Sequence, residues 1–295
     1  MAQKPLNGVI AAIATPVQEN GAPDIARAIK LAHYLLDNGC DGLNVLGTTG
    51  EATSFSMTER LSVMKAYKEN GLPLARLMVG TGAAAAADAI ALTKAAEEIG
   101  FGGALVLPPF YYKGVPDDGL AAYIEAIVRA TGIPLYLYNY PAMSGLPWHV
   151  ALIERLLKAH PGRIVGLKDS SGDMAYARAA AALGQDFAVF PSTEAALLDA
   201  RRGEFAGCIS ATANLNADLC GKAWRDGDAA TLEAAVAIRN LFTGKPLVSG
   251  VKALLAHIHG DPALARMKPP LMAFSATDTA AVTSGYDAVR GRRAA

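Results

Sequence analysis

Three short motifs in the sequence carry polar side chains directly after apolar runs, and these are the residues that could do chemistry. They are Gly-Thr-Thr-Gly-Glu at residues 47–51, Tyr-Asn-Tyr-Pro at 138–141, and Gly-Leu-Lys-Asp-Ser at 166–170. If each apolar run is a strand of one parallel sheet, the motifs meet at the carboxyl edge of that sheet. Backbone N–H groups, a phenol and an amine would then lie close together.

Lys168 and Tyr138 form the most reactive pair among these residues. Lys168 ends the apolar run 164–167, and Tyr138 precedes it by thirty residues, so the two side chains are expected to end neighbouring strands. A single lysine is more often a solvated surface charge, and an aromatic before Asn and Pro is also common turn chemistry. A lysine that faces the inside of a barrel can instead act as a nucleophile, and a phenol beside it can donate and accept a proton.

The loop at residues 47–51 is a candidate anion site. Its two glycines allow a tight turn that exposes successive backbone N–H groups, which suit a carboxylate or a phosphate. It is not a nucleotide-binding P-loop, because Gly-Lys-Ser/Thr does not follow at the required spacing. An ordinary turn between a strand and a helix is the alternative interpretation.

The elements that must position these motifs alternate along the chain as apolar runs and longer amphipathic segments. Continuous apolar strands separated by helices are typical of a parallel sheet covered by helices, and eight such units predict a (β/α)8 TIM barrel. The predicted strands are residues 9–17, 42–46, 74–80, 103–107, 134–138, 163–168, 187–190 and 207–211, and helical patterns include 57–70, 86–99, 119–130 and 148–159.

The barrel is expected to occupy residues 1–214. Residues 215–295 are predicted to form a helical C-terminal extension packed on it as part of one structural unit, with helical patterns at 229–241, 247–259 and after 276. Residues 290–295 contain three arginines and small residues, and we expect a solvated tail there.

Composition excludes several classes of protein. The chain has 295 residues, with 27 basic side chains balanced by 27 acidic ones, so it lacks the basic field that nucleic acid or an anionic membrane surface requires. The sequence contains no apolar run of about 20 residues, which is the length needed to span a bilayer. Three widely spaced cysteines form no CxxC pair, which favours a reducing cytoplasm. His257 and His259 would lie on different faces of a helix, so no metal site is expected.

With these motifs the chain resembles the dihydrodipicolinate synthase / N-acetylneuraminate lyase superfamily over essentially its whole length. The resemblance rests on residues 47–51, 138–141 and 166–169, each on the strand where the family carries its own motif. It implies that Lys168 attacks the keto carbon of pyruvate, or of a 2-oxo acid, to form an imine that stabilises an enamine. It also implies that no metal or organic cofactor is needed.

The resemblance also implies roles for the surrounding residues. Tyr138 would shuttle protons, Thr48 would hydrogen-bond Tyr138, and the N–H groups of Thr48 and Thr49 would hold the substrate carboxylate. Tyr111, with Tyr112 as the alternative, would complete the proton relay, usually from a neighbouring subunit. Further contacts with the substrate are expected from Gly47 and from the carbonyl of Ile209.

The second substrate is not fixed by family membership. Met143 stands where dihydrodipicolinate synthases usually place an arginine that clamps a carboxylate, and a thioether cannot replace a guanidinium in that role. Tyr140 is shared with 2-keto-3-deoxygluconate aldolases, which favours a 2-keto-3-deoxy sugar acid. The acidic pair of the sialic acid lyases is incomplete, because Ala195 follows Glu194. We expect Met143, Ser170, Ser192, Thr193 and Glu194 to contact the substrate.

The sequence therefore predicts a class I lyase that makes or breaks a C–C bond between pyruvate and an aldehyde. A dihydrodipicolinate synthase and a sugar-acid dehydratase that uses the same imine are alternatives. A 2-oxo acid binding protein without catalysis is the alternative outside the enzymes. By analogy with relatives, a homo-oligomer built as a dimer of dimers is expected.

Overall fold

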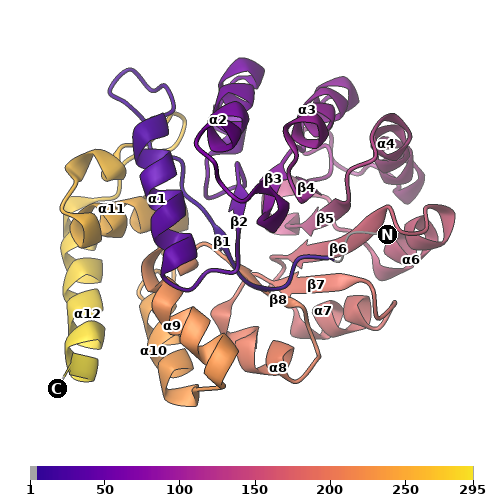
Figure 1. Cartoon of the computed structure of the whole chain (residues 1–295). Coiled ribbons are helices and arrows are strands. Elements are labelled where there is room, and N and C mark those ends of the chain that lie inside the picture. Colours follow the sequence, from indigo (N-terminus) through magenta and orange to yellow (C-terminus); the bar gives the residue numbers. More distant parts are fainter. Residues whose placement is uncertain (1–4, 295) are drawn as a thin grey trace.

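Eight parallel strands form one nearly closed barrel in the computed structural model, which describes residues 5–294 (Figure 1). The strand order is β7-β6-β5-β4-β3-β2-β1-β8. The N–H of Ala206, just before β8, donates to the carbonyl of Val189 on β7 at 2.9 Å and brings the two ends of the sheet together. The predicted (β/α)8 TIM barrel is confirmed. The strands are β1 (Gly8–Ala12), β2 (Gly42–Val45), β3 (Leu77–Gly80), β4 (Gly103–Val106), β5 (Leu135–Asn139), β6 (Ile164–Asp169), β7 (Ala188–Pro191) and β8 (Gly207–Ser210).

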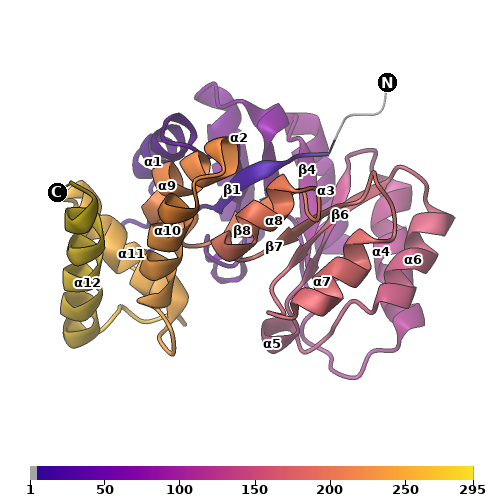
Figure 2. The ribbon, with the colours of Figure 1, turned by 90° about the horizontal axis from the view of Figure 1, so that it is seen from below.

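Helices follow the strands and surround them, as Figures 1 and 2 show. Capping side chains fix where several of them begin. At the start of α2, for example, Ser56 and Glu59 exchange hydrogen bonds as a capping box. The helices of the barrel are α1 (Ile25–Asp37), α2 (Met57–Glu69), α3 (Ala86–Ile99), α4 (Asp117–Ala130), α5 (Pro141–Ser144), α6 (Val150–Ala159), α7 (Met174–Ala181), α8 (Leu197–Arg201) and α9 (Ala213–Asp226).

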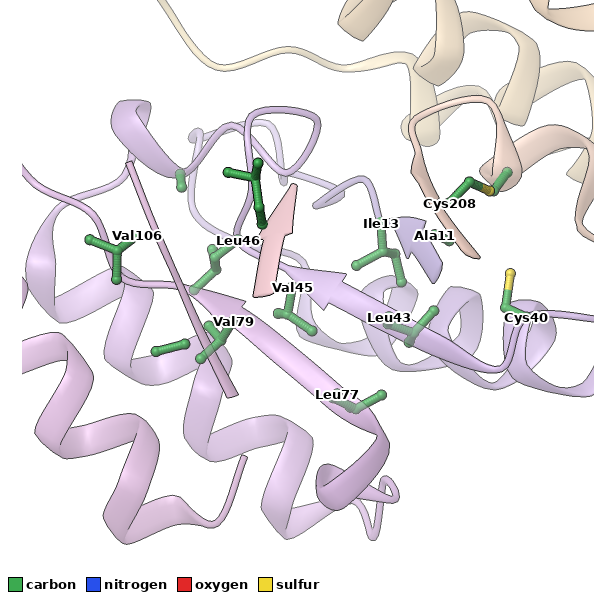
Figure 3. Close-up of a cluster of buried hydrophobic side chains, with 14 of the residues drawn as sticks. Ala11, Ile13, Cys40, Leu43, Val45, Leu46, Leu77, Val79, Val106 and Cys208 are labelled. Carbon is green, nitrogen blue, oxygen red and sulfur yellow. The ribbon is translucent and has the colours of Figure 1, made fainter. Parts of the chain in front are cut away.

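The strands have two apolar faces, which explains their nearly continuous hydrophobic sequences. On the outer face, alternate residues such as Leu43 and Val45 of β2 and Leu77 and Val79 of β3 pack beneath the helices (Figure 3). The inner face fills the barrel and makes it a packed core rather than a pore. Its members include Ile10, Met78, Leu105, Tyr136, Tyr138, Phe190 and Ile209.

The C-terminal part of the chain adds helices α10 (Ala229–Asn240), α11 (Leu247–His259) and α12 (Ala276–Ala294) on one side of the barrel (Figure 1). The predicted boundary after residue 214 falls inside α9. The expectation of a solvated tail from residue 290 is wrong at Arg290, because this residue belongs to α12 and its guanidinium pairs with Asp218 at 2.7 Å. Residue 295 lies outside the described residues.

Two predicted strands are shorter than expected by more than one residue. β1 ends at Ala12 rather than at residue 17. The apolar residues that follow are buried by packing without a strand ladder, and Pro16 has no N–H to donate to one. The run that begins at Leu74 forms a 3-10 turn over Leu74–Arg76 before β3 starts at Leu77.

Candidate active site

Lys168 and Tyr138 lie side by side inside the mouth of the barrel. They are directly paired in the register of β6 and β5, and both point inward because Leu167 and Leu137 occupy the outer face. Lys168 is 3% exposed, and its Nζ lies 4.4 Å from the centre of the Tyr138 ring. Within residues 5–294 the amine makes no ion pair or hydrogen bond. The amine therefore has no counter-charge that would occupy it.

Thr48 joins this pair from the loop after β2. Its Oγ1 lies 3.3 Å from the hydroxyl of Tyr138, and either atom can be the donor. The loop turns tightly, with the N–H of Glu51 donating to the carbonyl of Thr48 at 3.0 Å. Residue 47 must be a glycine, because the backbone here approaches the buried Asn44 so closely that a Cβ would lie 2.4 Å from its Oδ1. Amine, phenol and hydroxyl are thus brought together from three strands.

A buried ion pair fixes the loop after β2 to the C-terminal extension. Glu51, with a positive φ of 54°, pairs with Lys252 of α11, and both side chains are at most 1% exposed. Nζ of Lys252 also donates to the carbonyl of Thr15 at 3.1 Å. The second oxygen of Glu51 accepts from the N–H of Lys268 at 2.8 Å. Desolvation lowers the pKa of Lys252, and Glu51 acts against that shift.

The motif after β5 is held by polar contacts to its neighbours. The Asn139 amide donates to Asp169 at 2.8 Å and accepts from the N–H of Trp148 at 3.0 Å. The buried Trp148 indole donates to the carbonyl of Tyr138 at 3.1 Å. Burial raises the pKa of Asp169, against the hydrogen bonds from Asn139 and Ser171. These contacts fix the ends of β5 and β6, and with them the positions of Tyr138 and Lys168.

A cleft of about 610 Å³ opens above Lys168 at the carboxyl ends of the strands. Most of the predicted site residues line it, including Met143, whose side chain is exposed. Tyr140 lies there too, with its ring 5.9 Å from that of Tyr138. The predicted residues along the cleft are Thr48, Thr49, Tyr138, Met143, Lys168, Ser170, Ser192, Thr193 and Ile209.

Glu194 does not line this cleft. Its side chain is fully buried, and its oxygens accept hydrogen bonds from the hydroxyl of Thr212 and, at 3.3 Å each, from Asn216 and Arg239. The expected direct contact of Glu194 with a substrate hydroxyl does not fit this position, because the carboxylate is already occupied behind the cleft wall. Gly47 also lies outside the lining of the cleft and borders a smaller cavity beside Tyr138.

Tyr111 and Tyr112 are also outside the cleft of their own chain. They are 75% and 71% exposed and pack edge to face on each other with ring centres 5.4 Å apart. A single chain therefore does not bring either phenol to Tyr138. The expectation that one of them acts from a neighbouring subunit stays a prediction.

The sequence interpretation missed two cations in the wall of the cleft. Arg239 of α10 and Lys245, which precedes α11, both line it. Both belong to the C-terminal extension, for which the sequence predicted packing but no contact with the site. No motif marks them, because they reach the cleft only through the way the extension folds back.

An inward-facing amine next to a phenol, at the carboxyl end of a nearly closed ring of parallel strands, is an arrangement in which a barrel enzyme can use a lysine as a nucleophile. The chain belongs to the dihydrodipicolinate synthetase family, whose model matches residues 5–286. It is accordingly an enzyme of the class I lyase type. Within residues 5–294, no helix is both long and apolar enough to cross a membrane.

Two relatives illustrate the breadth of the match. An uncharacterized DapA-like lyase of Chloroflexus aurantiacus is 31% identical over 290 residues, which is 96% of each chain. A 4-hydroxy-tetrahydrodipicolinate synthase of Acidiphilium cryptum is 35% identical over 238 residues, which is 79% of this chain and 80% of the relative.

Solved structures agree with this assignment. Dihydrodipicolinate synthase of Agrobacterium tumefaciens is 30% identical, with a TM-score of 0.90 over 96% of this chain and 99% of that one. YagE of Escherichia coli, solved in complex with pyruvate, is 25% identical, with a TM-score of 0.89 over 96% and 98%. A variant of the 2-keto-3-deoxygluconate aldolase of Sulfolobus solfataricus is 19% identical over 97% of each chain, with a TM-score of 0.88, and shares the fold alone.

Proposed function

We propose that this enzyme cleaves or forms a C–C bond between pyruvate and an aldehyde, with Lys168 as the Schiff-base residue and no metal or organic cofactor. One observation carries the proposal. The amine of Lys168 is buried at the mouth of the barrel, free of ion pairs within residues 5–294, and faces the ring of Tyr138 on the next strand.

The reaction follows from this geometry. The Lys168 amine adds to the keto carbon of the substrate, and loss of water gives an imine. When the C3–C4 bond breaks, its electron pair moves into the imine and leaves an enamine. Tyr138 would take the proton of the C4 hydroxyl as the aldehyde forms and pass its own phenolic proton into a relay through Thr48. Protonation of the enamine at C3 and hydrolysis then release pyruvate and free Lys168.

The carboxylate of the 2-oxo acid is proposed to bind at the loop after β2. Thr49 is 5% exposed, and with Thr48 it lines the same cleft as Lys168. The carbonyl of Ile209 on β8 would face the other side of the bound pyruvyl group. Backbone N–H donors fixed in a loop stabilise charge without reorganisation during the reaction.

A 2-keto-3-deoxy sugar acid is the proposed substrate. Hydroxyl-bearing residues Ser170, Ser192 and Thr193 line the cleft beyond Lys168, which suits a polyhydroxylated chain. Met143 offers no carboxylate clamp where dihydrodipicolinate synthases usually carry an arginine. A synthase or a dehydratase acting through the same imine is the second candidate, and the relative in Acidiphilium cryptum, which is named a synthase, supports it.

An assembly of several chains is proposed to complete the site. The exposed pair Tyr111 and Tyr112 presents two aromatic rings to solvent, which is unusual for a surface without a partner. In a dimer of dimers, one of these phenols would reach Tyr138 of the adjacent chain and extend the proton relay.

Reduction with borohydride in the presence of pyruvate tests the function directly. We expect one reduced pyruvyl adduct per chain, which peptide mass spectrometry places on Lys168, because hydride traps the imine as a stable secondary amine. Lys168→Ala should lose the adduct, whereas Lys158→Ala, which alters an exposed lysine of α6, should keep it.

Two results would contradict the proposal. An unmodified wild-type protein would support a binding protein without catalysis, and an adduct on another lysine would remove Lys168 from the mechanism. Once the adduct is established, screening sugar acids for released pyruvate separates a lyase from a dehydratase.

A further inference from the structure

The cations in the cleft wall face the cleft, while their carboxylate partners lie behind it. Arg239 pairs with Glu194, and Lys245 pairs with Asp278 of α12. Arg239 and Lys245 line the cleft, but Glu194 and Asp278 do not. Each ion pair therefore directs its positive end toward the space above Lys168.

The guanidinium of Arg239 is hydrogen-bonded through one of its three nitrogens. Its Nη1 donates to Glu194 and to Ser210 at 3.3 Å each, and to Thr212 at 3.4 Å. Within residues 5–294, its Nε and Nη2 have no hydrogen bond, and its side chain is 27% exposed. A guanidinium that is fixed at one nitrogen and open at its others is preorganised to bind a carboxylate through two parallel hydrogen bonds.

Lys245 adds a second positive charge from the same side. Its side chain is 30% exposed, and the segment between α10 and α11 carries it to the cleft. Asp169 is the carboxylate among the residues that line the cleft, and it is occupied by Asn139 and Ser171. An incoming anion would therefore meet two cations and one carboxylate whose oxygens are already hydrogen-bonded.

We propose that Arg239 and Lys245 form a distal subsite for a second carboxylate, so that the substrate is a 2-oxo acid with an acidic group at each end. This inference rests on the proposed function, because it assumes that the keto carbon is bound to Lys168. The first carboxylate then lies on the loop after β2, and the second lies over β8, to which Arg239 is tied through Ser210. The cleft of about 610 Å³ leaves room for a chain that links both ends.

The subsite also assigns a role to residues that do not touch the substrate. Glu194, Thr212 and Asn216 are positioning residues in this proposal, because their hydrogen bonds hold the guanidinium in the wall of the cleft. A terminal hydroxymethyl group would leave the free donors of Arg239 without a charged partner, whereas a terminal carboxylate would satisfy them.

Pairs of 2-oxo acids that differ only at the far end provide the test. Borohydride trapping on Lys168 is measured against concentration for 2-oxoadipate and 2-oxohexanoate, and again for 2-oxoglutarate and 2-oxopentanoate. We expect the better diacid to reach half-maximal trapping at a concentration at least about tenfold lower than its monoacid, as for one charge-assisted bidentate contact. Arg239→Gln and Lys245→Gln should each reduce this preference, and the double variant should abolish it.

Matched variants separate a binding effect from a folding effect. Arg202→Gln alters an exposed arginine of the surface and should keep the full preference. Because Arg239→Gln leaves Glu194 buried without its cation, the pair Glu194→Gln and Arg239→Gln removes both charges together. If neither Arg239 variant folds, the diacid preference of Lys245→Gln alone tests the subsite. Its partner Asp278 is partly exposed to solvent, so the loss of Lys245 leaves no buried charge.

The outcomes distinguish this inference from the function on which it rests. Absence of any pyruvate adduct in the wild-type protein overturns the function. A normal pyruvate adduct with equal trapping of diacids and monoacids overturns the subsite alone, as does a preference that survives in the folded double variant. Trapping of pyruvate itself should be unchanged in the control Arg202→Gln, because Arg202 lies outside the cleft.

Discussion

At the scale of single residues, the proposed role of the Tyr138 phenol in proton transfer can be tested. Tyr138→Phe removes only the hydroxyl that contacts Thr48 and leaves the ring beside Lys168. The variant should fold as the wild type does. Because general acid–base groups contribute about 10²–10⁴-fold, exchange of the C3 protons of pyruvate with D₂O, followed by NMR, should slow by that factor.

This measurement does not require the second substrate to be known, since enamine formation alone exchanges those protons. Tyr34→Phe, in a tyrosine of α1 outside the cleft, is the control and should exchange at the wild-type rate. An unchanged rate in Tyr138→Phe would take the phenol out of proton transfer.

The sequence could locate Lys168, Tyr138 and Thr48 because each ends or directly follows a strand, and strand ends converge in a parallel barrel. It could not show where Glu194 points. That carboxylate is held away from the cleft by Thr212 and Asn216 at the start of α9 and by Arg239 of α10, which come later in the chain. Long-range polar contacts of this kind leave no local pattern in a sequence, so Arg239 itself was also missed.

At the scale of elements, α11 is tied to the loop that is proposed to bind the carboxylate. Among residues 5–294, Lys252 and Glu51 form the only ion pair in which both side chains are at most 1% exposed. The pair links a helix of the C-terminal extension to the loop after β2. The C-terminal helices therefore support the site in addition to covering the barrel.

Lys252→Met should lower the free energy of unfolding by about 3–5 kcal/mol, because it leaves Glu51 buried without its cation. The same loop should bind pyruvate less well, so the concentration for half-maximal borohydride trapping should rise. Urea denaturation measures the first effect. Adding Glu51→Gln to Lys252→Met should recover part of the lost stability, since the uncompensated charge is removed.

Lys222→Met serves as the matched control, because Lys222 is 53% exposed and pairs with Asp228 at the surface. Its loss should cost about 1 kcal/mol or less. If Lys252→Met is no more destabilising than Lys222→Met, the buried pair does not hold the loop.

Element boundaries were less predictable than element order. The eight apolar runs fall on the eight strands, but β1 stops at Ala12 although the apolar pattern continues to residue 17. Hydropathy reports burial, and the residues after Ala12 are buried by packing. Only hydrogen bonding defines the strand, and Pro16 lies where a ladder would need a donor.

At the scale of the whole molecule, closure of the barrel buries three thiols in one region of the core. Cys40, Cys208 and Cys220 are each at most 2% exposed and free of disulfides. The eight apolar runs in the sequence favoured a closed barrel rather than an open sheet. The contact of β8 with β1 that makes closure possible joins residues about two hundred positions apart and is visible only in the structure.

These buried thiols should make the protein lose stability at alkaline pH. Burial raises the pKa of Cys40 from 9.0 to about 12, and it raises those of Cys208 and Cys220 well above 9.0. Below pH 9 the thiols are protonated in both the folded and the unfolded chain, so stability is complete. Above pH 9 the unfolded chain loses these protons while the folded chain keeps them, so the free energy of unfolding falls by up to about 1.4 kcal/mol per pH unit for each thiol.

Urea denaturation between pH 8 and pH 11 checks this slope. Buried tyrosines steepen this decline only at higher pH. The ordinary pKa of a tyrosine is 10.0, and burial raises the pKa of Tyr123 and of Tyr136 to about 12. Replacing the three cysteines by alanine lowers stability at every pH but should flatten the decline between pH 9 and pH 10, where thiols dominate. Parallel curves for the wild type and the cysteine-free variant would mean that the thiols ionise equally well in the folded barrel, and therefore that the core admits water where the closed structure excludes it.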